Sequence, residues 1–589
     1  MHGVRAAMRA IRELVPGARL VQTEDLGKTH AVRTLAYQAR FENERRWLTF
    51  DLLTGRLGPE ARMWRHLHRG CAVRESELAS FVEDPCPPDL LGINHYLTSE
   101  RFLDRRLARY PASTHGGNRR HRYADVEAVR VLAAGPDGPA RVLREAWDRY
   151  GRPMAVTECH LGCTREQQMR WLAAVWAAAQ DLRADGVDLR AVTAWSTFGA
   201  FDWASLLTRD DGHYEPGAFD VRAPAPRATA LAGMMRDLAT RGACDHPALD
   251  GPGWWESPQR LMYWPAGRID RRRDETPLRP ARHAAPRRVL VTGARGTLGH
   301  AVVRACEERG LAYHAASRPE LDLLDEAALV AVLDAVRPWA VVNAAGYARI
   351  DDAERERDAC WRENVCAPAA LARACAQRGI ALVTFSSDLV FDGALDRPYV
   401  EADATAPLGA LGSSHAAGER AVLDAHPAAL VVRTSACFGP SSDRDFITLA
   451  LRALAADAPF AALSDVVVSP TYRPALVDAA LDLLIDGERG VWHVANAGAL
   501  TWYELARAAA HHAGLSTATL VPVPLDAAGL TAPRPRFSPL ASERGTILGD
   551  VDRAVRAYVD TRRRLRGTHA WAGHTEPARP LVPTLSLQR

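Results

Sequence analysis

Residues 288–299 read RVLVTGARGTLG, and this stretch decides the fold of the second half of the chain. A short strand rich in β-branched residues runs into a turn that contains three glycines, Gly293, Gly296 and Gly299. A helix is predicted directly after the turn. Glycines at these positions let the backbone approach a pyrophosphate, which then sits on the helix N-terminus. The spacing predicts an α/β fold with a Rossmann doubly wound parallel sheet that binds a dinucleotide.

The end of the second predicted strand indicates which dinucleotide binds. An acidic residue there would accept a hydrogen bond from the ribose 2′-hydroxyl and select NAD. This chain has Ser317 and Arg318 instead. A guanidinium suits a 2′-phosphate, so we expect NADP, with NAD as the other possibility. The alternative for Arg318 is a solvated loop cation.

Five further stretches appear in a recognisable order. They are VVNAAGYARIDDAE (341–354), FSSDLVFDG (385–393), RPYVEAD (397–403), VVVSPTY (466–472) and APRPRFSPL (532–540). Over about residues 287–555 the chain resembles dTDP-4-dehydrorhamnose reductases, members of the extended short-chain dehydrogenase/reductase superfamily. The resemblance implies a Rossmann core with a small C-terminal substrate lobe. It also implies hydride transfer from a nicotinamide cofactor to C4 of a 4-keto-6-deoxy-sugar nucleotide, in deoxysugar or polysaccharide synthesis.

The resemblance also implies site residues and partners. Ser387 falls where the family has its catalytic serine or threonine. The substrate would be a nucleotide sugar, and a homodimer is an open alternative to a monomer. The residues implied for cofactor binding are Gly293, Gly296, Thr297, Leu298, Gly299, Arg318, Asp322, Leu323, Ala344, Ala345, Gly346 and Tyr347.

One stretch, PLGALGSSHAAGER (407–420), departs from the family pattern. In members of the family, a tyrosine donates the proton to the ketone oxygen. A lysine four residues later holds the nicotinamide ribose and lowers the pKa of the tyrosine. Leu411 and His415 stand at these two positions. A register slip cannot hide the lysine, because the only lysine of the chain is Lys28.

The proton would therefore come from His415, Ser387 or water. An imidazole titrates near neutrality, so His415 could serve as the acid. The alternative is a catalytically impaired sensor or scaffold that binds NADP and a nucleotide sugar without turnover.

The first half of the chain alternates predicted helices with short apolar strands, which is typical of a parallel sheet or barrel. The stretches GINHY (92–96), TECH (157–160) and AWSTFGAFDW (194–203) resemble the C-terminal half of family 1 glycoside hydrolases, which are β-glucosidase-like (β/α)8 barrels. The resemblance puts Glu158 at the nucleophile position, with Asn94, Tyr96, Trp195, Asp202 and Trp203 facing the sugar.

The Asn-Glu-Pro tripeptide that carries the acid/base glutamate of that family is absent. Strands one to four of the barrel are missing with it, so we expect a partial (β/α)8 barrel, its second half only. We also expect the natural protein to begin before Met1. A glycosidase with an accessory reductase-like domain is a further alternative.

Composition limits the partners. The chain has 589 residues, a net charge of +3 and ten cysteines. Nothing in the charge points to nucleic acid or to an anionic membrane, and the cysteines are too irregular for a disulfide framework. No apolar run approaches the length of about 18 residues that spans a bilayer. We expect a cytoplasmic protein without nucleic-acid or membrane partners, and without a metal, because Cys159, His160 and Cys163 lack a second ligand pair.

Composition also suggests the domain boundaries. Pro, Gly and Arg dominate residues 241–286 without periodicity, as in a linker. The predicted organisation is a barrel-like part at 1–240, a linker at 241–286, a reductase-like domain at 287–560 and a disordered tail at 561–589.

Overall fold

The computed structural model describes residues 1–263, 286–318, 320–567 and 571. The chain forms two compact units. The first contains Met1–Thr197 and Met234–Ala284, and the second contains Phe198–Gly233 and Ala285–Arg589. In the part of the chain described here, no helix combines the length and the apolar character that crossing a bilayer requires.

The second unit is built on a six-stranded parallel sheet. Its strand order is β14-β13-β15-β16-β17-β22, and every neighbouring pair is parallel. The apolar residues of the opening strand are fully buried, as expected for a strand covered on both faces. The predicted Rossmann-like sheet is confirmed. The strands are β13 (Val289–Thr292), β14 (Tyr313–Ala316), β15 (Ala340–Asn343), β16 (Ala381–Ser387), β17 (Leu430–Thr434) and β22 (Gly490–His493).

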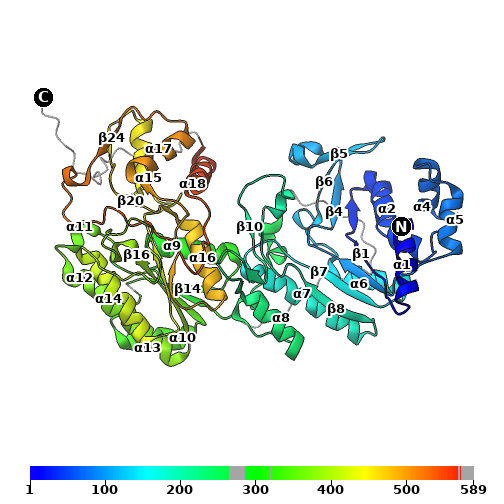
Figure 1. Cartoon of the computed structure of the whole chain (residues 1–589), viewed down its shortest axis with the longest axis horizontal. Helices are drawn as coiled ribbons and strands as arrows, with labels where there is room; N and C mark the ends of the chain where they lie inside the picture. Colours follow the sequence, from blue (N-terminus) through cyan, green and yellow to red (C-terminus); the bar gives the residue numbers. More distant parts are fainter. Residues whose placement is uncertain (264–285, 319, 568–570, 572–589) are drawn as a thin grey trace. The chain divides into compact units, whose positions relative to one another are not determined.

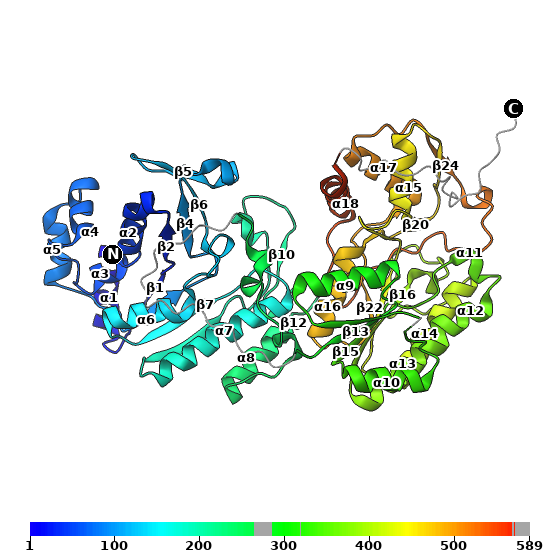
Figure 2. The same ribbon diagram turned by 180° about the vertical axis from the view of Figure 1, so that it is seen from behind.

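Helices cover both faces of this sheet (Figures 1 and 2). On one face α9 packs beside α16, and on the other α13 packs against α10 and α14. Because helices cover both faces, the inner strands β13 and β15 are buried along their whole length. The carboxyl ends of the strands stay free to bind ligands. The helices are α9 (Thr297–Arg309), α10 (Glu326–Val336), α13 (Ala367–Arg378), α14 (Ala410–Ala425) and α16 (Arg473–Ile485).

A smaller lobe gathers beyond the carboxyl ends of the strands (Figure 1). It has its own apolar core, in which Phe446, Leu505 and Tyr558 are buried together. Its main elements are α15 (Phe446–Ala455), β19 (Phe460–Leu463), α17 (Trp502–Ala513), β24 (Leu520–Val523) and α18 (Val551–Arg566).

Helix α18 corrects the predicted disordered tail at 561–589. The helix continues to Arg566, and Arg562 inside it is fully buried. The Arg562 guanidinium donates to the Asp443 carboxylate at 2.8 Å and to the Pro440 carbonyl at 3.2 Å. The amphipathic pattern therefore extends past the predicted boundary. Of the rest of the predicted tail, residues 568–570 and 572–589 lie outside the described residues.

The first unit contains a four-stranded parallel sheet in the order β1-β3-β7-β8. The strands follow one another along the sheet in the same order as in the sequence. Half of a (β/α)8 barrel and an open parallel sheet both have this order, so the partial barrel stays a prediction. A second, mixed sheet has the order β2-β4-β6-β5. The elements are β1 (Val21–Asp25), β2 (Thr29–Ala31), β3 (Leu90–Asn94), β4 (Arg101–Asp104), β5 (His115–Gly117), β6 (Arg122–Glu127), α6 (Gly138–Tyr150), β7 (Met154–Cys159), α7 (Arg165–Ala184) and β8 (Leu189–Ala194).

The compact units do not follow the predicted boundary at residue 240. Residues 198–233 belong to the second unit, where the Arg227 guanidinium contacts the Asp486 carboxylate at 2.9 Å and that of Glu488 at 3.1 Å. The backbone N–H of Ala230 donates to the buried side chain of Asp486 at 2.7 Å. These ion pairs join segments far apart in the sequence, so composition alone could not reveal them.

The predicted linker is partly folded. In the first unit, Trp255 is buried and meets the ring of Trp171 edge-on at 5.3 Å. The Arg170 guanidinium donates to the carbonyls of Ala248 and Pro252 at 2.8 and 2.9 Å. Residues 241–263 are therefore ordered by packing that the Pro/Gly composition does not indicate, and residues 264–285 lie outside the described part.

Candidate functional site

A cleft of about 450 Å³ opens at the carboxyl ends of β13, β14 and β15. The chain leaves β13 toward β14 on one side and places β15 on the other, so the strand order changes direction here. Ligands of open parallel sheets bind in the crevice at such a switch point. The cleft therefore lies where a Rossmann fold binds its dinucleotide.

The glycines of the turn keep this cleft open. Gly293 has a φ of +68°, and a Cβ on it would lie 2.5 Å from the backbone nitrogen of Ala345. A Cβ on Gly299 would lie 2.1 Å from the Gly293 carbonyl oxygen. Neither position accepts a side chain without a backbone shift. The turn consequently brings the N-terminus of α9 to the cleft with no side chain at Gly293, Gly296 or Gly299, which fits a bound pyrophosphate.

The structure brings most of the predicted cofactor residues together. The exceptions are Thr297, Leu298 and Gly299, which form the first turn of α9 beside the cleft, and Tyr347. Tyr347 is buried, and its hydroxyl donates to Glu356 at 2.9 Å. The predicted residues that line the cleft are Gly293, Gly296, Arg318, Asp322, Leu323, Ala344, Ala345 and Gly346.

Three charged residues of the cleft were not predicted from the sequence: Arg295, Arg362 and Glu363. Arg295 stands inside the glycine turn, so its place in the motif could have marked it. Arg318 is 72% exposed, and its guanidinium contacts the Glu363 carboxylate at 2.9 Å. Three guanidiniums thus line a site that would receive phosphates, and one of them is already paired with a carboxylate.

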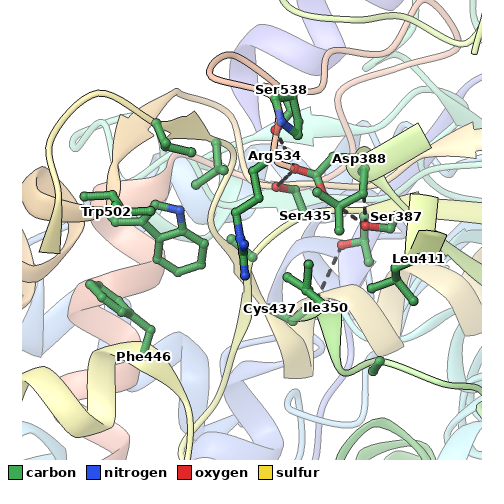
Figure 3. A pocket seen from close by; sticks show the side chains of 18 of the residues that line it. Ile350, Ser387, Asp388, Leu411, Ser435, Cys437, Phe446, Trp502, Arg534 and Ser538 are labelled. Atoms are coloured by element: carbon green, nitrogen blue, oxygen red, sulfur yellow. Dashed lines mark hydrogen bonds between the residues drawn. The ribbon is translucent and has the colours of Figure 1, made fainter. Parts of the chain in front are cut away.

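A second cavity of about 290 Å³ lies near the ends of β16 and β17. The loop after β15 contributes to both hollows, with 344–346 in the cleft and Ala348 and Ile350 in the cavity. Figure 3 shows Trp502 on one side, the Ser387 and Asp388 group on the other, and Arg534 reaching between them. The cavity can therefore hold a ligand with an apolar and a polar side.

Ser387 ends β16 and caps the short helix η11 (Asp388–Val390), because its Oγ accepts from the Leu389 N–H at 3.2 Å. The same hydroxyl donates to Oδ1 of Asp388 at 3.1 Å. Oδ2 of Asp388 accepts from the hydroxyls of Ser435 at 2.8 Å and Ser538 at 2.7 Å. Burial raises the pKa of the Asp388 carboxyl group, although the three hydroxyls act in the opposite direction.

Leu411 and His415 both line the cavity from α14. Leu411 is buried in an apolar cluster with Tyr347 and Cys360 and offers no proton. Burial lowers the pKa of His415 to about 4, so its imidazole is neutral at pH 7. His415 therefore supplies no permanent charge at the family's lysine position, and it carries no imidazolium proton to donate.

A buried ion pair holds α14 in place. The Arg433 guanidinium on β17 donates to both oxygens of Glu419 on α14, at 2.9 and 2.7 Å. Both side chains are about 5% exposed, and Ser386 also donates to Glu419. This contact fixes the position of α14 along its own axis relative to β17. It thereby also fixes Leu411 and His415 relative to the ends of the strands.

In the first unit, Glu158 lies near the end of β7, and the Tyr96 hydroxyl donates to its carboxylate. Next to it, Thr157 donates to Oδ1 of Asn94 at 2.6 Å. The carboxyl ends of β3 and β7 thus bring together Asn94, Tyr96 and Glu158, whereas Asp202 and Trp203 of the predicted site belong to the second unit.

The first unit also holds a charged cluster that the sequence did not indicate. His30, Glu100 and Asp137 have ligand atoms within 4.8 Å of one another. The Glu100 carboxylate accepts from the N–H groups of Asp137 and Gly138, both at 2.7 Å. The Lys28 ammonium contacts Asp137 at 2.7 Å. Protein donors and a lysine thus already neutralise these carboxylates, which fits a structural network.

Comparisons with known proteins concern the second half of the chain. The family model described as the RmlD substrate binding domain matches residues 287–560. The chain is 34% identical over 306 residues to a dTDP-4-dehydrorhamnose reductase of Mycolicibacterium smegmatis, which covers 51% of this chain and 88% of that protein. It is 35% identical over 257 residues to a dTDP-4-keto-6-deoxy-D-glucose reductase of Streptomyces niveus, covering 44% and 89%. A solved dTDP-4-dehydrorhamnose reductase of Bacillus anthracis in complex with NADP is 26% identical, with a TM-score of 0.45, over 47% of this chain and 99% of that one.

Proposed function

The chain belongs to the dTDP-4-dehydrorhamnose reductase family, and on this premise we propose that its second unit reduces the C4 ketone of a 4-keto-6-deoxy-sugar nucleotide with NADPH. The single observation that carries the proposal is the loop after β15. It lines both the cleft at the glycine turn and the cavity that contains Ser387. A nicotinamide and a sugar bound in these two hollows would meet along one loop.

The cleft suits the adenosine and pyrophosphate part of the cofactor. The α9 N-terminus would face the pyrophosphate, and Arg295 and Arg318 suit a 2′-phosphate, which favours NADP over NAD. When bound, the reduced nicotinamide supplies a hydride to the carbonyl carbon. This assignment rests on the shape of the turn and on the charge of the cleft.

The cavity suits the sugar nucleotide. Trp502 and Phe446 meet edge-on at 4.8 Å and form an apolar wall, which excludes water from one side of the substrate. Arg534 is held by the Asp351 carboxylate at 2.7 Å and reaches the cavity as an ordered cation. On the opposite side, the Ser387 hydroxyl lines the cavity and would face the ketone oxygen of a bound sugar.

NADPH oxidation in the presence of dTDP-4-dehydrorhamnose tests the proposal. We expect turnover by the full chain, and a Kd for NADPH that calorimetry can measure. NADPH binding without turnover would instead support the sensor or scaffold that the Leu411 and His415 positions leave open.

A pair of glycine variants tests the cleft itself. Gly299→Ala forces a Cβ against the Gly293 carbonyl, so NADPH binding should weaken at least about tenfold. Gly310→Ala is the matched control, because Gly310 ends the same helix with a φ of +63°. It should lower stability while leaving the Kd for NADPH unchanged.

The first unit offers a second candidate only through Glu158. Its place near a strand end and its Tyr96 partner support a glycosidase-like site, because barrel active sites lie at strand ends. A retaining glycosidase also needs a second carboxylate about 5–5.5 Å away, and the Asn-Glu-Pro stretch that supplies it in the family is absent. We therefore expect no hydrolysis of aryl glycosides by the full chain. Hydrolysis that disappears in Glu158→Gln would reverse this conclusion.

A further inference from the structure

We propose that Asp388 is the proton reservoir of the reductase site: the ketone oxygen takes its proton from the Ser387 hydroxyl, and Ser387 recovers it from the Asp388 carboxyl group. This inference rests on the proposed reductase function. It assigns to a neighbouring carboxyl group the proton that neither Leu411 nor neutral His415 can supply.

The Ser387 hydroxyl has a single proton to donate. Its Oγ accepts from the Leu389 N–H at 3.2 Å and donates to Asp388 at 3.1 Å. When Asp388 is ionised, this proton points at the carboxylate and away from the cavity. When Asp388 is protonated, its O–H can donate to Ser387, and the Ser387 O–H can then turn toward a ligand. Only the acid form of Asp388 makes Ser387 a proton donor.

The surroundings of Asp388 favour that acid form. Asp388 is 5% exposed, and its hydrogen-bond partners in the described part of the chain are the hydroxyls of Ser387, Ser435 and Ser538. No guanidinium or ammonium lies among these partners. Burial without a cation raises the pKa of a carboxyl group, so a fraction of Asp388 stays protonated well above the range of an exposed aspartate.

The other titratable groups that line the cavity do not compete for this role. His415 has a pKa of about 4 and is neutral at pH 7. Burial raises the pKa of the Cys437 thiol, which keeps it protonated and a weak donor. Arginine side chains are not deprotonated in proteins, and the Arg534 guanidinium is held by the Asp351 carboxylate. Among these groups, Asp388 alone combines burial, contact with Ser387 and a carboxyl pKa that burial raises.

Reduction of the ketone requires one hydride and one proton. A hydride from the reduced nicotinamide adds to the carbonyl carbon, and the carbonyl electron pair moves to oxygen. That oxygen takes the proton of Ser387, while the Ser387 oxygen takes the proton of Asp388, which becomes a carboxylate. A solvent proton restores Asp388 after product release. Ketone, reduced nicotinamide and one proton thus yield alcohol and oxidised nicotinamide.

The pH profile of kcat tests the relay. In the wild type we expect kcat to fall tenfold per pH unit above the pKa of Asp388, because only the protonated form is active. Asp388→Asn keeps the shape of the side chain but has no acidic proton, so it should lower kcat by about 10²–10⁴-fold. It should also remove the falling limb of the pH profile, which is the decrease of kcat at high pH. Asp392→Asn, the same change four residues away, is the control and should keep the limb.

Two serine variants separate a proton reservoir from a structural carboxylate. Ser435→Ala and Ser538→Ala each remove a hydroxyl that stabilises ionised Asp388. Each should therefore move the falling limb to higher pH. A merely structural Asp388 would leave the limb in place. Calorimetric binding of NADPH to every variant checks that the site remains folded.

A spectroscopic readout does not depend on turnover. The infrared carbonyl band of a protonated carboxylic acid should persist in the wild type above the pH at which exposed aspartates ionise. It should disappear as the pH rises further, and be absent from Asp388→Asn. Absence of an Asp388-dependent band, or a wild-type pH limb in Asp388→Asn, overturns the relay while the reductase function stands. Wild-type protein that binds NADPH but never oxidises it overturns the reductase function, and with it this step.

Discussion

The guanidinium of Arg433 holds both carboxylate oxygens of Glu419, at 2.9 and 2.7 Å, and joins β17 to α14 beneath the reductase cavity. Because α14 carries Leu411 and His415, this buried pair sets the position of the two residues that depart from the family pattern. The same pair should contribute to the free energy of unfolding of the second unit.

Arg433→Met should destabilise the second unit by about 3–5 kcal/mol, because it leaves the Glu419 charge buried without its partner. Chemical denaturation followed by tryptophan fluorescence measures the loss. Arg420→Met on the exposed face of the same helix is the control, and it should change stability by no more than about 0.5 kcal/mol. The double variant Arg433→Met/Glu419→Leu should lose less than Arg433→Met alone. Equal losses would show that the charge of Glu419 is not what costs stability.

Glu363 should set the preference for NADPH by pairing with Arg318. Arg318→Ala removes a cation from the cleft, so the ratio of the Kd for NADH to that for NADPH should fall at least about tenfold. Glu363→Gln leaves Arg318 unpaired and should raise the same ratio. Both ratios come from calorimetric titrations. A ratio unchanged in both variants would mean that the 2′-phosphate binds elsewhere.

Restoring the tyrosine and lysine of the family at positions 411 and 415 should reduce the dependence of kcat on Asp388. Leu411 lines the cavity, so a tyrosine there has space into which its hydroxyl can extend, and a lysine at position 415 restores the missing cation. We expect Leu411→Tyr/His415→Lys to recover at least about tenfold of the kcat lost in Asp388→Asn, since a general acid contributes about 10²–10⁴-fold. Leu411→Phe/His415→Lys has the same bulk without the hydroxyl and should recover nothing.

His415 should make the second unit sensitive to acid. Its pKa of about 4 lies below the ordinary value of 6.5, so the unfolded chain binds a proton before the folded one does. The contribution of neutral His415 to the free energy of unfolding is complete above pH 6.5, and it is lost as the pH drops toward 4. In thermal melts between these pH values, His415→Gln should lose less stability than the wild type. Parallel pH dependence in both proteins would contradict the burial of a neutral imidazole.

Much of the fold and of the cofactor cleft could be predicted because their signals are local. A glycine turn between a strand and a helix allows few conformations, and the positions of Gly293 and Gly299 follow from steric exclusion alone. Ala344, Ala345, Gly346 and Tyr347 were instead expected at the cofactor from the family resemblance. The first three line the cleft, whereas the position of Tyr347 depends on its contact with Glu356, which motif spacing does not encode.

The sequence by itself determined the Rossmann-like sheet, the glycine turn and the loss of the family tyrosine and lysine, since each is a matter of residue type and spacing. Only the tertiary structure decided the state of the remaining groups. It withdraws the half-buried His415 from solvent enough to keep its imidazole neutral at pH 7. It also surrounds Asp388 with serines from three separate segments, and joins residues 198–233 to the second unit through Arg227 and Asp486. The physical reason is that burial and charge pairing depend on contacts between distant segments, which periodicity and motif spacing do not encode.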